Sequence, residues 1–326
     1  MKLLLTPIGS LYEMLSDKPK FHHYLLLVLL GAIWGSSFFL IKVTLETVSP
    51  VTLTAFRLFF AFLALTALVM VLGKKFPTDM GTWRRYGIIA VTGNILPFIL
   101  ISWGELHIDS GLAAILMSVV PLTALFVAHF WTDDEKMSLP KITGTLVGFC
   151  GVILLVGPDV LKGLGDSVLG QLAVAFASFC YGATSVYARK TGLVKLDPIV
   201  NGSAILLCAS VMAIPMAFIL EDPLSLDPTL ESIGALISLA VLSTAIAYII
   251  LYYLLGSVGA NFTALNNYLV PVFGMVWGYM FLSESYGMDA FVALAVILFG
   301  IIITQLGKKR RKILGGPVLA SGKTGE

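Results

Sequence analysis

Long runs of apolar residues, separated by short polar connections, fill most of this chain. A transmembrane helix needs about 20 mainly apolar residues, because each residue adds about 1.5 Å across a hydrocarbon core about 30 Å thick. The runs that reach or approach this length cover residues 24–41, 51–72, 86–103, 112–131, 142–157, 168–188, 199–220, 233–254, 262–282 and 288–306. The pattern predicts an all-α integral membrane protein with ten transmembrane helices.

The composition agrees with this pattern. The chain is 58% hydrophobic and 12% charged, whereas about 25% of the residues in a soluble domain are charged. The apolar runs leave no stretch for a separate water-soluble domain, and connections such as 73–77 and 221–223 carry the Gly, Pro and Asp typical of turns. We therefore expect a multi-pass protein whose surroundings are a lipid bilayer.

The basic residues predict the orientation of the helices. The chain holds 21 Lys and Arg, and if the amino terminus is cytoplasmic, 18 of them fall in cytoplasmic segments. Only Lys42 and Lys162 then lie in outside loops, and Arg57 lies within a helix. Because cytoplasmic loops are enriched in Lys and Arg, both termini are predicted to be cytoplasmic, which also supports an even number of helices.

Two pairs of similar segments predict an internal duplication. Residues 34–42 resemble residues 181–189 at an offset of 147, and residues 119–122 resemble residues 269–272 at an offset of 150. An odd number of five helices per copy forces the second copy to enter the membrane from the opposite side. We expect two inverted five-helix repeats, 24–157 and 168–306, between a cytoplasmic segment 1–23 and a basic cytoplasmic tail 307–326, as in many secondary transporters.

Arg57 is the only basic residue well inside a predicted span, about 9 Å from its start. A cation within the membrane is energetically expensive and is usually functional. The alternative is that its long side chain reaches back to the outer surface of the bilayer. The sequence leaves the depth of Arg57 open.

The ninth run carries a polar and small-residue face. Asn267, Pro271, Gly274 and Gly278 share this face at helical spacing, with Asn266 and Tyr268 beside it. Amide groups facing lipid would lose their hydrogen bonds, so at least one asparagine should face protein or a water-filled pathway. The competing interpretation is an interhelical hydrogen bond with close packing at the glycines.

Other candidates for a solute pathway are aromatic or hydroxyl residues within the spans. They are Trp34 and Ser37 on one face of the first helix, Trp103 at the end of the third, Tyr181 in the sixth, and Tyr248 in the eighth, where it aligns with Thr244. For Trp34, an interfacial aromatic position is the equal alternative. Asn94 and Pro97 are expected to interrupt the third helix, as either a hinge or a passive kink.

The sequence lacks several motifs of catalysis and metal binding, and this limits the functions that we expect. The acids Glu105, Asp109, Glu221, Asp222 and Asp227 are assigned to connections, and only Glu284 approaches a span, so we expect no buried acid for a proton relay. No phosphate-binding loop, nucleophile elbow or metal-ligand cluster is present. We therefore expect no enzyme activity, no catalytic residue, no metal or cofactor, and no nucleic-acid partner.

The order of short motifs along residues 25–306 resembles the EamA family of the drug/metabolite transporter superfamily. The matching segments are 34–37, Pro50 with Arg57-Leu58, Trp103 through Pro121, Ala247-Tyr248, Pro271 and 282–284. The resemblance implies a permease with two inverted repeats around a central cavity, in a family that exports amino acids, other small metabolites and sometimes drugs. One departure is 133–135, where three acids stand in place of a single equivalent of Glu284.

We therefore expect a bacterial inner-membrane permease that exports small amphipathic metabolites, with amino acids or related solutes as the leading class, by alternating access. The alternatives are a carrier of sugars or nucleotide derivatives, a drug-efflux permease, an intramembrane enzyme, and a structural or sensory membrane subunit. The predicted partners are a small-molecule solute and the bilayer. The sequence leaves open the solute, the energy source and whether the chain forms a homodimer.

Overall fold

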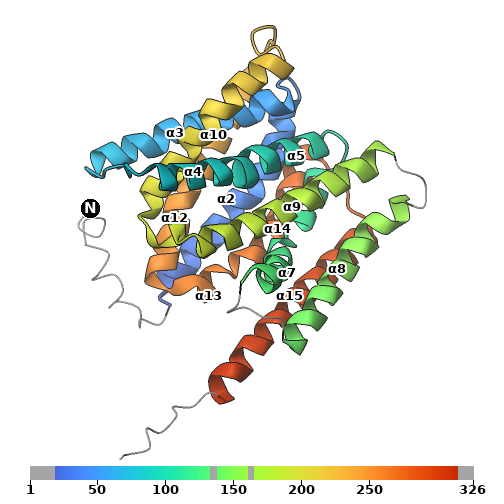
Figure 1. Ribbon diagram of the computed structural model, residues 1–326. Coiled ribbons are helices and arrows are strands. Elements are labelled where there is room, and N and C mark those ends of the chain that lie inside the picture. Colours follow the sequence, from blue (N-terminus) through green and yellow to red (C-terminus); the bar gives the residue numbers. More distant parts are fainter. Residues whose placement is uncertain (1–18, 133–137, 161–164, 315–326) are drawn as a thin grey trace, which may run out of the picture.

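The computed structural model describes residues 19–132, 138–160 and 165–314, and all regular elements within these ranges are helices. Figure 1 shows their arrangement. The first half contains α2 (Phe21–Leu45), α3 (Pro50–Val71), α4 (Met80–Ala90), η2 (Val91–Ile95), α5 (Leu96–Glu105), α6 (Ser110–Met117), α7 (Val120–Trp131) and α8 (Leu139–Val160). The second contains α9 (Asp166–Lys190), η3 (Leu193–Lys195), α10 (Pro198–Leu220), α11 (Leu230–Ala240), η4 (Val241–Ile246), α12 (Ala247–Ser257), α13 (Gly259–Thr263), α14 (Asn266–Leu282) and α15 (Met288–Leu314).

Seven helical stretches among the described residues are long and apolar enough to cross a membrane. They are Phe21–Leu45, Pro50–Val71, Met80–Glu105, Ser110–Trp131, Asp166–Lys190, Pro198–Leu220 and Leu230–Ser257. Leu139–Leu155 and Met288–Thr304 are shorter apolar helices. The ninth predicted run is divided by a turn between α13 and α14. An all-helical protein with several spans is therefore confirmed, whereas ten spans remain a prediction.

The helices pack in pairs that join distant parts of the sequence. In Figure 1, α3 lies beside α10, and α8 lies beside α15 at the edge of the molecule. Helix α2 packs against α14, and α9 packs against both α5 and α7. Each of these pairs joins a helix of the first half to a helix of the second half. The centre of the molecule is thus built from both halves of the chain.

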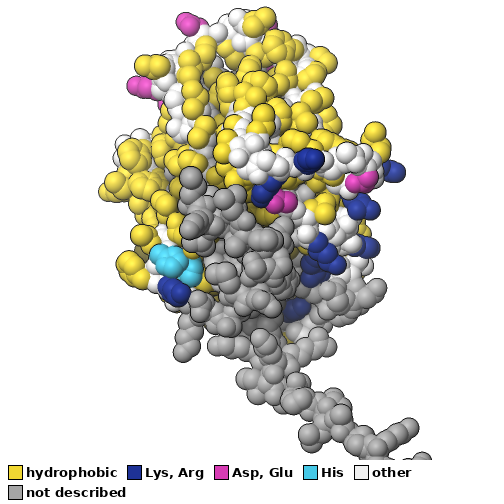
Figure 2. Space-filling view, turned by 90° about the vertical axis from the view of Figure 1, so that its left-hand side faces the viewer, with side chains coloured by type: hydrophobic (Ala, Val, Ile, Leu, Met, Phe, Trp, Pro, Cys, Tyr) yellow, Lys and Arg dark blue, Asp and Glu magenta, His cyan; other side chains and the backbone are white. Residues whose placement is uncertain are grey.

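The outer surface of the described helices is largely apolar. Large hydrophobic side chains such as Met70, Ile153, Phe176 and Ile219 are exposed. Figure 2 shows one face covered mainly by hydrophobic side chains, and the upper part of that face carries no Lys or Arg. Contiguous apolar surface of this extent is unusual in a water-soluble monomer, so it agrees with a protein surrounded by lipid.

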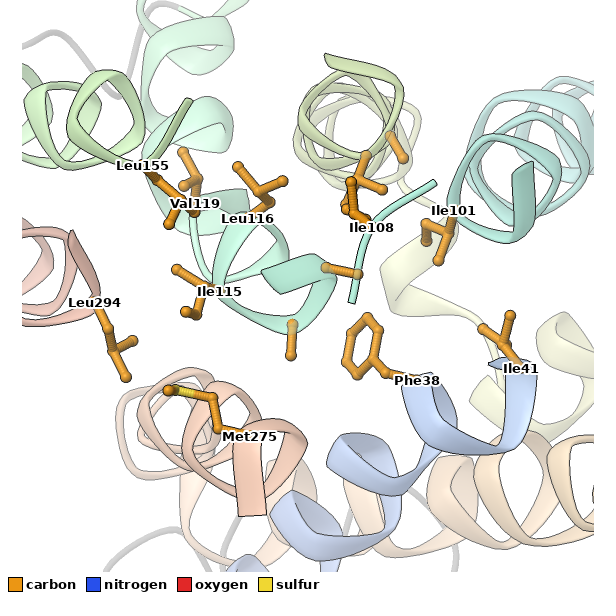
Figure 3. Close-up of a cluster of buried hydrophobic side chains, with 14 of the residues drawn as sticks. Phe38, Ile41, Ile101, Ile108, Ile115, Leu116, Val119, Leu155, Met275 and Leu294 are labelled. Carbon is orange, nitrogen blue, oxygen red and sulfur yellow. The ribbon is translucent and has the colours of Figure 1, made fainter. Parts of the chain in front are cut away.

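The apolar interior joins several helices around α6. Figure 3 shows Ile115 and Leu116 on α6, with Phe38 of α2, Met275 of α14 and Leu294 of α15 around that helix in the same cluster. All five side chains are buried. Because lipid tails are as apolar as these side chains, close packing rather than exclusion of water stabilises the contact.

Glycine allows α2 and α14 to approach closely. A Cβ atom on Gly35 would lie 2.6 Å from Phe273 Cβ and 2.9 Å from the Gly274 nitrogen. Gly274, which the sequence places on the small-residue face, is itself buried, as are Pro271 and Gly278. The structure therefore contains the close packing at the glycines that one interpretation of this face predicted.

Replacement of Gly35 by leucine is expected to destabilise the protein. The new side chain would overlap the backbone of α14, and overpacking of this kind typically costs about 1–3 kcal/mol. The apparent melting temperature in detergent, measured by loss of the monodisperse peak in gel filtration, should fall. Gly87→Leu is the matched control, because nothing lies within 4 Å of a Cβ atom at Gly87. Equal melting temperatures for the two variants would refute the packing role.

Two π-helical turns interrupt the helices that contain the predicted third and eighth spans. The first, η2, includes Asn94 and ends just before Pro97, where the sequence predicts an interruption. The second, η4, includes Thr244. Each turn frees a backbone carbonyl: Asn94 Nδ2 donates to the Ile89 carbonyl at 3.3 Å, and Thr244 Oγ1 donates to the Leu239 carbonyl at 2.9 Å. π-helical turns of this kind occur frequently at functional sites.

Two further prolines, Pro121 and Pro271, differ in their effect on the helices that contain them. Pro121 follows the turn at Ser118 and Val119 that separates α6 from α7. Pro121 lacks the N–H group that would donate to the carbonyl four residues before it, which agrees with the end of α6 at this place. Pro271 instead lies inside α14 and leaves that helix continuous.

Candidate functional site

Arg57 lies in the interior of the protein, at the contact between the two halves. Its side chain is 6% exposed, so it does not reach back to the surface. The Nε atom donates a hydrogen bond to Thr244 Oγ1 at 3.4 Å. The guanidinium carbon lies 4.1 Å from the centre of the Phe98 ring, a cation–π geometry. The structure thus resolves the two sequence alternatives in favour of a buried cation.

Helix α3, which carries Arg57, is held at its amino-terminal end by a carboxylate from the other half. Glu221 accepts hydrogen bonds from Ser49 Oγ at 2.5 Å, Thr52 N and Thr52 Oγ1 at 2.8 Å, and Val51 N at 3.1 Å. A negative charge is favourable at this end of a helix, where N–H groups have no partner within the helix. Glu221 therefore fixes α3 against the end of α10 and so helps to place Arg57.

Two tyrosines from the second half complete what we call the Arg57 cluster: Arg57, Phe98, Tyr181, Thr244 and Tyr248. Tyr181 of α9 and Tyr248 of α12 lie near enough to interact electrostatically with Arg57. The Tyr181 ring also packs beside the Phe98 ring, with 6.5 Å between centroids. Five helical elements thus converge at one buried cation.

The Arg57 cluster holds more hydrogen-bond donors than acceptors. Within the described residues, Nε is the only guanidinium nitrogen of Arg57 with a hydrogen bond, and no carboxylate forms an ion pair with it. A guanidinium group carries five N–H donors in a planar fork that matches a carboxylate. The arrangement can therefore bind an anionic oxygen group, with phenol hydroxyls and aromatic faces beside it.

A second polar group lies where α2, α5 and α6 meet. Lys42 Nζ donates to the backbone carbonyls of Glu105 and Ile108, the latter at 2.7 Å, and so satisfies carbonyls near the carboxyl end of α5. Glu284, which follows α14, accepts from Ser110 N at 2.8 Å and Gly111 N at 3.2 Å at the start of α6. Backbone ends that would otherwise lack partners are thereby joined across three helices.

Tyr286 and Asp109 border this group and lie outside the helical spans. The Tyr286 hydroxyl donates to Glu284 Oε2 at 2.5 Å. Burial, together with this hydrogen bond to Glu284, raises the pKa of Tyr286, so its hydroxyl stays protonated as a donor. Burial, together with the nearby negative charge of Glu284, also raises the pKa of Asp109.

Replacement of Glu284 by alanine is expected to lower the stability of the protein. The change leaves the Ser110 and Gly111 N–H groups without acceptors, and loss of a helix cap typically costs about 0.5–2 kcal/mol. The thermal midpoint in detergent should fall. The midpoint of Glu284→Gln should fall less, because glutamine keeps one side-chain oxygen as an acceptor. Glu231→Ala is the control, since Glu231 is exposed in the first turn of α11. A midpoint for Glu284→Ala equal to that of the control would contradict this role.

The remaining predicted pathway residues are divided between the interior and the surface. Trp34 is half-buried and packs against an apolar cluster formed by residues of α2 and α12. Ser37 is buried and its hydroxyl has no hydrogen bond within the described residues. Trp103, by contrast, is 37% exposed and packs against the His107 ring.

The asparagines of the ninth run have different surroundings. Asn266 is 2% exposed and its side-chain amide has no hydrogen-bond partner among the described residues. It faces α2 at Gly31. Asn267 and Tyr268 are half-buried, and Tyr268 packs against the apolar cluster around α6. The buried amide is thus that of Asn266.

Sequence reasoning missed Phe98 of the Arg57 cluster and misplaced Glu105. Phe98 did not stand out because it lies within an apolar run. Its one signal is that it precedes Tyr248 by 150 residues, which is the offset of one pair of repeated segments. Glu105 was assigned to a connection, and that prediction is wrong: Glu105 is the last residue of α5 and is fully buried. The expectation that the protein has no buried acid is therefore also wrong. The three acids at 133–135, which the sequence analysis compared with Glu284, lie outside the described residues.

A groove of about 270 Å³ lies between α3 and α10. Its lining consists of apolar side chains and Ser210, with no charged group. The three cysteines form no disulfide, and no cluster of metal-binding side chains occurs among the described residues. The Arg57 cluster is therefore the candidate site.

The fold and the relatives of the chain define its class. A crystal structure of another protein matches with a TM-score of 0.65 at 18% identity, covering 89% of this chain and 99% of that one, which shows a shared fold. Uncharacterized transporter YoaV of Bacillus subtilis is 24% identical over 86% of this chain and 96% of its own. Uncharacterized inner membrane transporter YedA of Escherichia coli is 27% identical over 85% and 88%, respectively. The chain is a multi-pass membrane transporter.

The family follows from a match to most of the chain. The model of the EamA-like transporter family matches residues 23–157 and 168–306. The chain belongs to this family, and the resemblance seen in the sequence is confirmed. A WAT1-related chloroplast protein of Arabidopsis thaliana is also similar, at 25% identity over 83% of this chain and 66% of its own.

Proposed function

We propose that this protein is a secondary transporter of small amphipathic solutes that carry a carboxylate, with amino acids as the leading class. The observation that carries this proposal is the buried guanidinium of Arg57, which has no carboxylate partner among the described residues. A buried charge without a partner is costly, and a solute carboxylate would supply acceptors for the remaining N–H groups. Phe98, Tyr181 and Tyr248 offer apolar and hydroxyl contacts to the rest of the solute.

Corresponding features in the two halves support transport by alternating access between inverted repeats. The π-helical turns begin at Val91 and Val241, 150 residues apart. Each is closed by a side chain bonding five residues back. Close approaches also correspond: Gly35 meets residues 273–274, and Gly182 meets Thr123 and Ala124. These pairs favour ten spans arranged as two five-helix repeats, with the Arg57 cluster between them.

The distribution of basic residues supports cytoplasmic termini. The proposal further places the protein in the inner membrane, with net movement of solute outward in the cell. An alternating-access carrier is reversible, so the gradients of solute and of any coupled ion decide the direction. A site for nucleotide derivatives would need several cations, whereas the Arg57 cluster holds one. A sugar carrier would have no use for an unpaired guanidinium, and a structural subunit would not need one.

Uptake by purified protein in liposomes tests this proposal. Vesicles loaded with a mixture of unlabelled L-amino acids are diluted into buffer with trace amounts of labelled amino acids, and parallel vesicles hold sugars or nucleosides with the matching label. We expect transient accumulation by exchange only with the amino acids. Exchange of sugars or nucleosides alone, or no exchange of any class by protein that remains monodisperse, would contradict the proposal.

A further inference from the structure

Three buried hydroxyl groups of the first half lack hydrogen-bond partners. Ser37 of α2, Thr54 of α3 and Ser102 of α5 are 7%, 0% and 1% exposed, and none of their side-chain oxygens has a partner among the described residues. A hydroxyl group in a helix can donate to a backbone carbonyl of the preceding turn, as those of Ser36 and Ser210 do. A buried polar group without a partner is costly. We call these three residues the hydroxyl layer.

Two members of the hydroxyl layer lie one helical turn from a contact within the Arg57 cluster. Thr54 precedes Arg57 by three residues on α3, and Ser102 follows Phe98 by four residues on α5. Residues three or four apart share one face of an α-helix. Since the Arg57 guanidinium lies against the Phe98 ring, Thr54 and Ser102 extend from this contact along facing sides of the two helices.

Both extensions lead in the same direction. The end of α2 meets the end of α5, because Lys42 Nζ donates to the backbone carbonyls of Glu105 and Ile108. Helix α3 begins five residues after α2 ends, so the start of α3 lies near this meeting point as well. Thr54, toward the start of α3, and Ser102, toward the end of α5, are therefore on the same side of the Arg57 cluster.

Ser37 on α2 lies at the same level. The backbone carbonyl of Ile33, one turn before Ser37, accepts a hydrogen bond from Ser243 Oγ at 3.4 Å. Ser243 adjoins Thr244, whose hydroxyl oxygen accepts the hydrogen bond from Arg57. Ser37 is thus one turn from the level of the Arg57 cluster, as are the other two members of the hydroxyl layer.

The apolar residues beside the hydroxyl layer support this placement. Phe38, Leu53 and Ile101 each adjoin one of its members in sequence and belong to a single buried cluster, in which Figure 3 labels Phe38 and Ile101. Helices α2, α3 and α5 also pack against one another. The fourth buried hydroxyl without a partner among the described residues is that of Thr145. It belongs to α8, which packs against α15 at the edge of the molecule.

We propose that the hydroxyl layer binds the amino group of a solute whose carboxylate pairs with Arg57. An ammonium group has three N–H donors and no acceptor, and each hydroxyl oxygen can accept. The hydroxyl hydrogens can then turn to backbone carbonyls of the preceding turn. In an α-amino acid, the nitrogen and a carboxylate oxygen lie about 3 Å apart. Each hydrogen bond adds about 2.9 Å, so the solute can span groups one helical turn, about 5.4 Å, apart.

This inference rests on the proposed function and names what selects the solute. Arg57 alone would accept any small carboxylate, whereas the hydroxyl layer favours a carboxylate that carries an amino group beside it. Hydrogen bonds to a charged group are among the stronger ones in proteins. We therefore expect removal of one hydroxyl group to weaken the preference for the amino group by about tenfold.

Inhibition of amino-acid exchange in liposomes tests this assignment. Each labelled amino acid that exchanges is inhibited with its unlabelled form or with the carboxylic acid that lacks only the amino group. Wild type should prefer the amino acid by about tenfold or more. Thr54→Val keeps the shape of the side chain without its hydroxyl group and should lose this preference, whereas Thr54→Ser keeps the hydroxyl group and should retain it. The reverse order would show that Thr54 acts through packing and would overturn the proposal.

Ser102→Ala should lose the preference as Thr54→Val does. Thr145→Ala is the matched control, because it removes a hydroxyl group that is equally buried and without a partner among the described residues, and it should behave as wild type. Ser37→Ala takes the place of either variant if that variant does not elute as a monodisperse peak. A preference equal to that of wild type in the hydroxyl-layer variants would refute the assignment.

Failure of this inference can be told apart from failure of the proposed function. The proposed function fails if monodisperse wild-type protein exchanges no amino acid, and the assignment of the hydroxyl layer then fails with it. The assignment alone fails if wild type exchanges amino acids and prefers them to their amides, but is inhibited equally by the carboxylic acids that lack the amino group.

Discussion

Replacement of Arg57 by glutamine is expected to reduce amino-acid exchange by about 10- to 100-fold. A hydrogen bond to a charged group typically contributes about 1.5–3 kcal/mol, and the variant keeps a polar side chain but loses the charge and the planar fork. Exchange in liposomes at several concentrations measures the change, which should appear mainly as a higher half-saturation concentration. Arg57→Lys should retain part of the affinity, because it keeps the charge but not the bidentate geometry.

The control for this prediction is Arg84→Gln. Arg84 is an exposed residue of α4 with no hydrogen bond among the described contacts. Exchange by this variant should match wild type. If Arg57→Gln exchanged amino acids with unchanged half-saturation concentration and rate, Arg57 would be a structural cation and the proposed site would be wrong.

Deletion of one residue from a π-helical turn is expected to abolish exchange while leaving most of the helical structure. Removing Leu242 converts η4 to an ordinary α-helix. Because each residue of an α-helix turns the chain by about 100° and advances it by about 1.5 Å, the deletion changes the register between the helix before η4 and α12. Thr244 and Tyr248 could then no longer both face Arg57.

Deletion of Gly93 from η2 should have a similar effect through Phe98 and the contact of η2 with Thr184. Deletion of Leu224, an 83% exposed residue of the connection after α10, is the control. Circular dichroism and gel filtration report folding, and liposome exchange reports function. Normal exchange by either π-turn deletion would show that these turns do not position the site.

The membrane class and the helical fold could be predicted because they follow from the length and spacing of the apolar runs. The family was indicated by its resemblance in the order of short motifs such as 34–37 and 282–284. The sequence also brought Arg57, Tyr181 and Tyr248 into one list of candidates, and the structure places them together. These residues stand out since a charged or phenolic group is unusual within an apolar run. Asn94 and Pro97 likewise indicated the interruption at η2, because each disfavours a regular helix.

Other parts of the site left no comparable signal. Phe98 is one apolar residue among many, and only the contact with Arg57 distinguishes it. Glu105 lies at the end of a run, where its burial depends on α2, α3 and α9 packing around it rather than on its own neighbours in sequence. Asn266 and Asn267 are adjacent amides, and the packing of α14 against α2 decides which of them is enclosed.

The central claim, that Arg57 binds the solute carboxylate, is tested most directly by changing the solute and the protein together. Exchange of labelled amino acids is inhibited with amino acids or with the corresponding amino-acid amides, in liposomes that contain wild type or Arg57→Gln. We predict that wild type prefers the carboxylate to the amide by about tenfold or more, and that Arg57→Gln loses most of this preference, as a coupling between contacting groups requires. The same preference in both proteins would contradict the account.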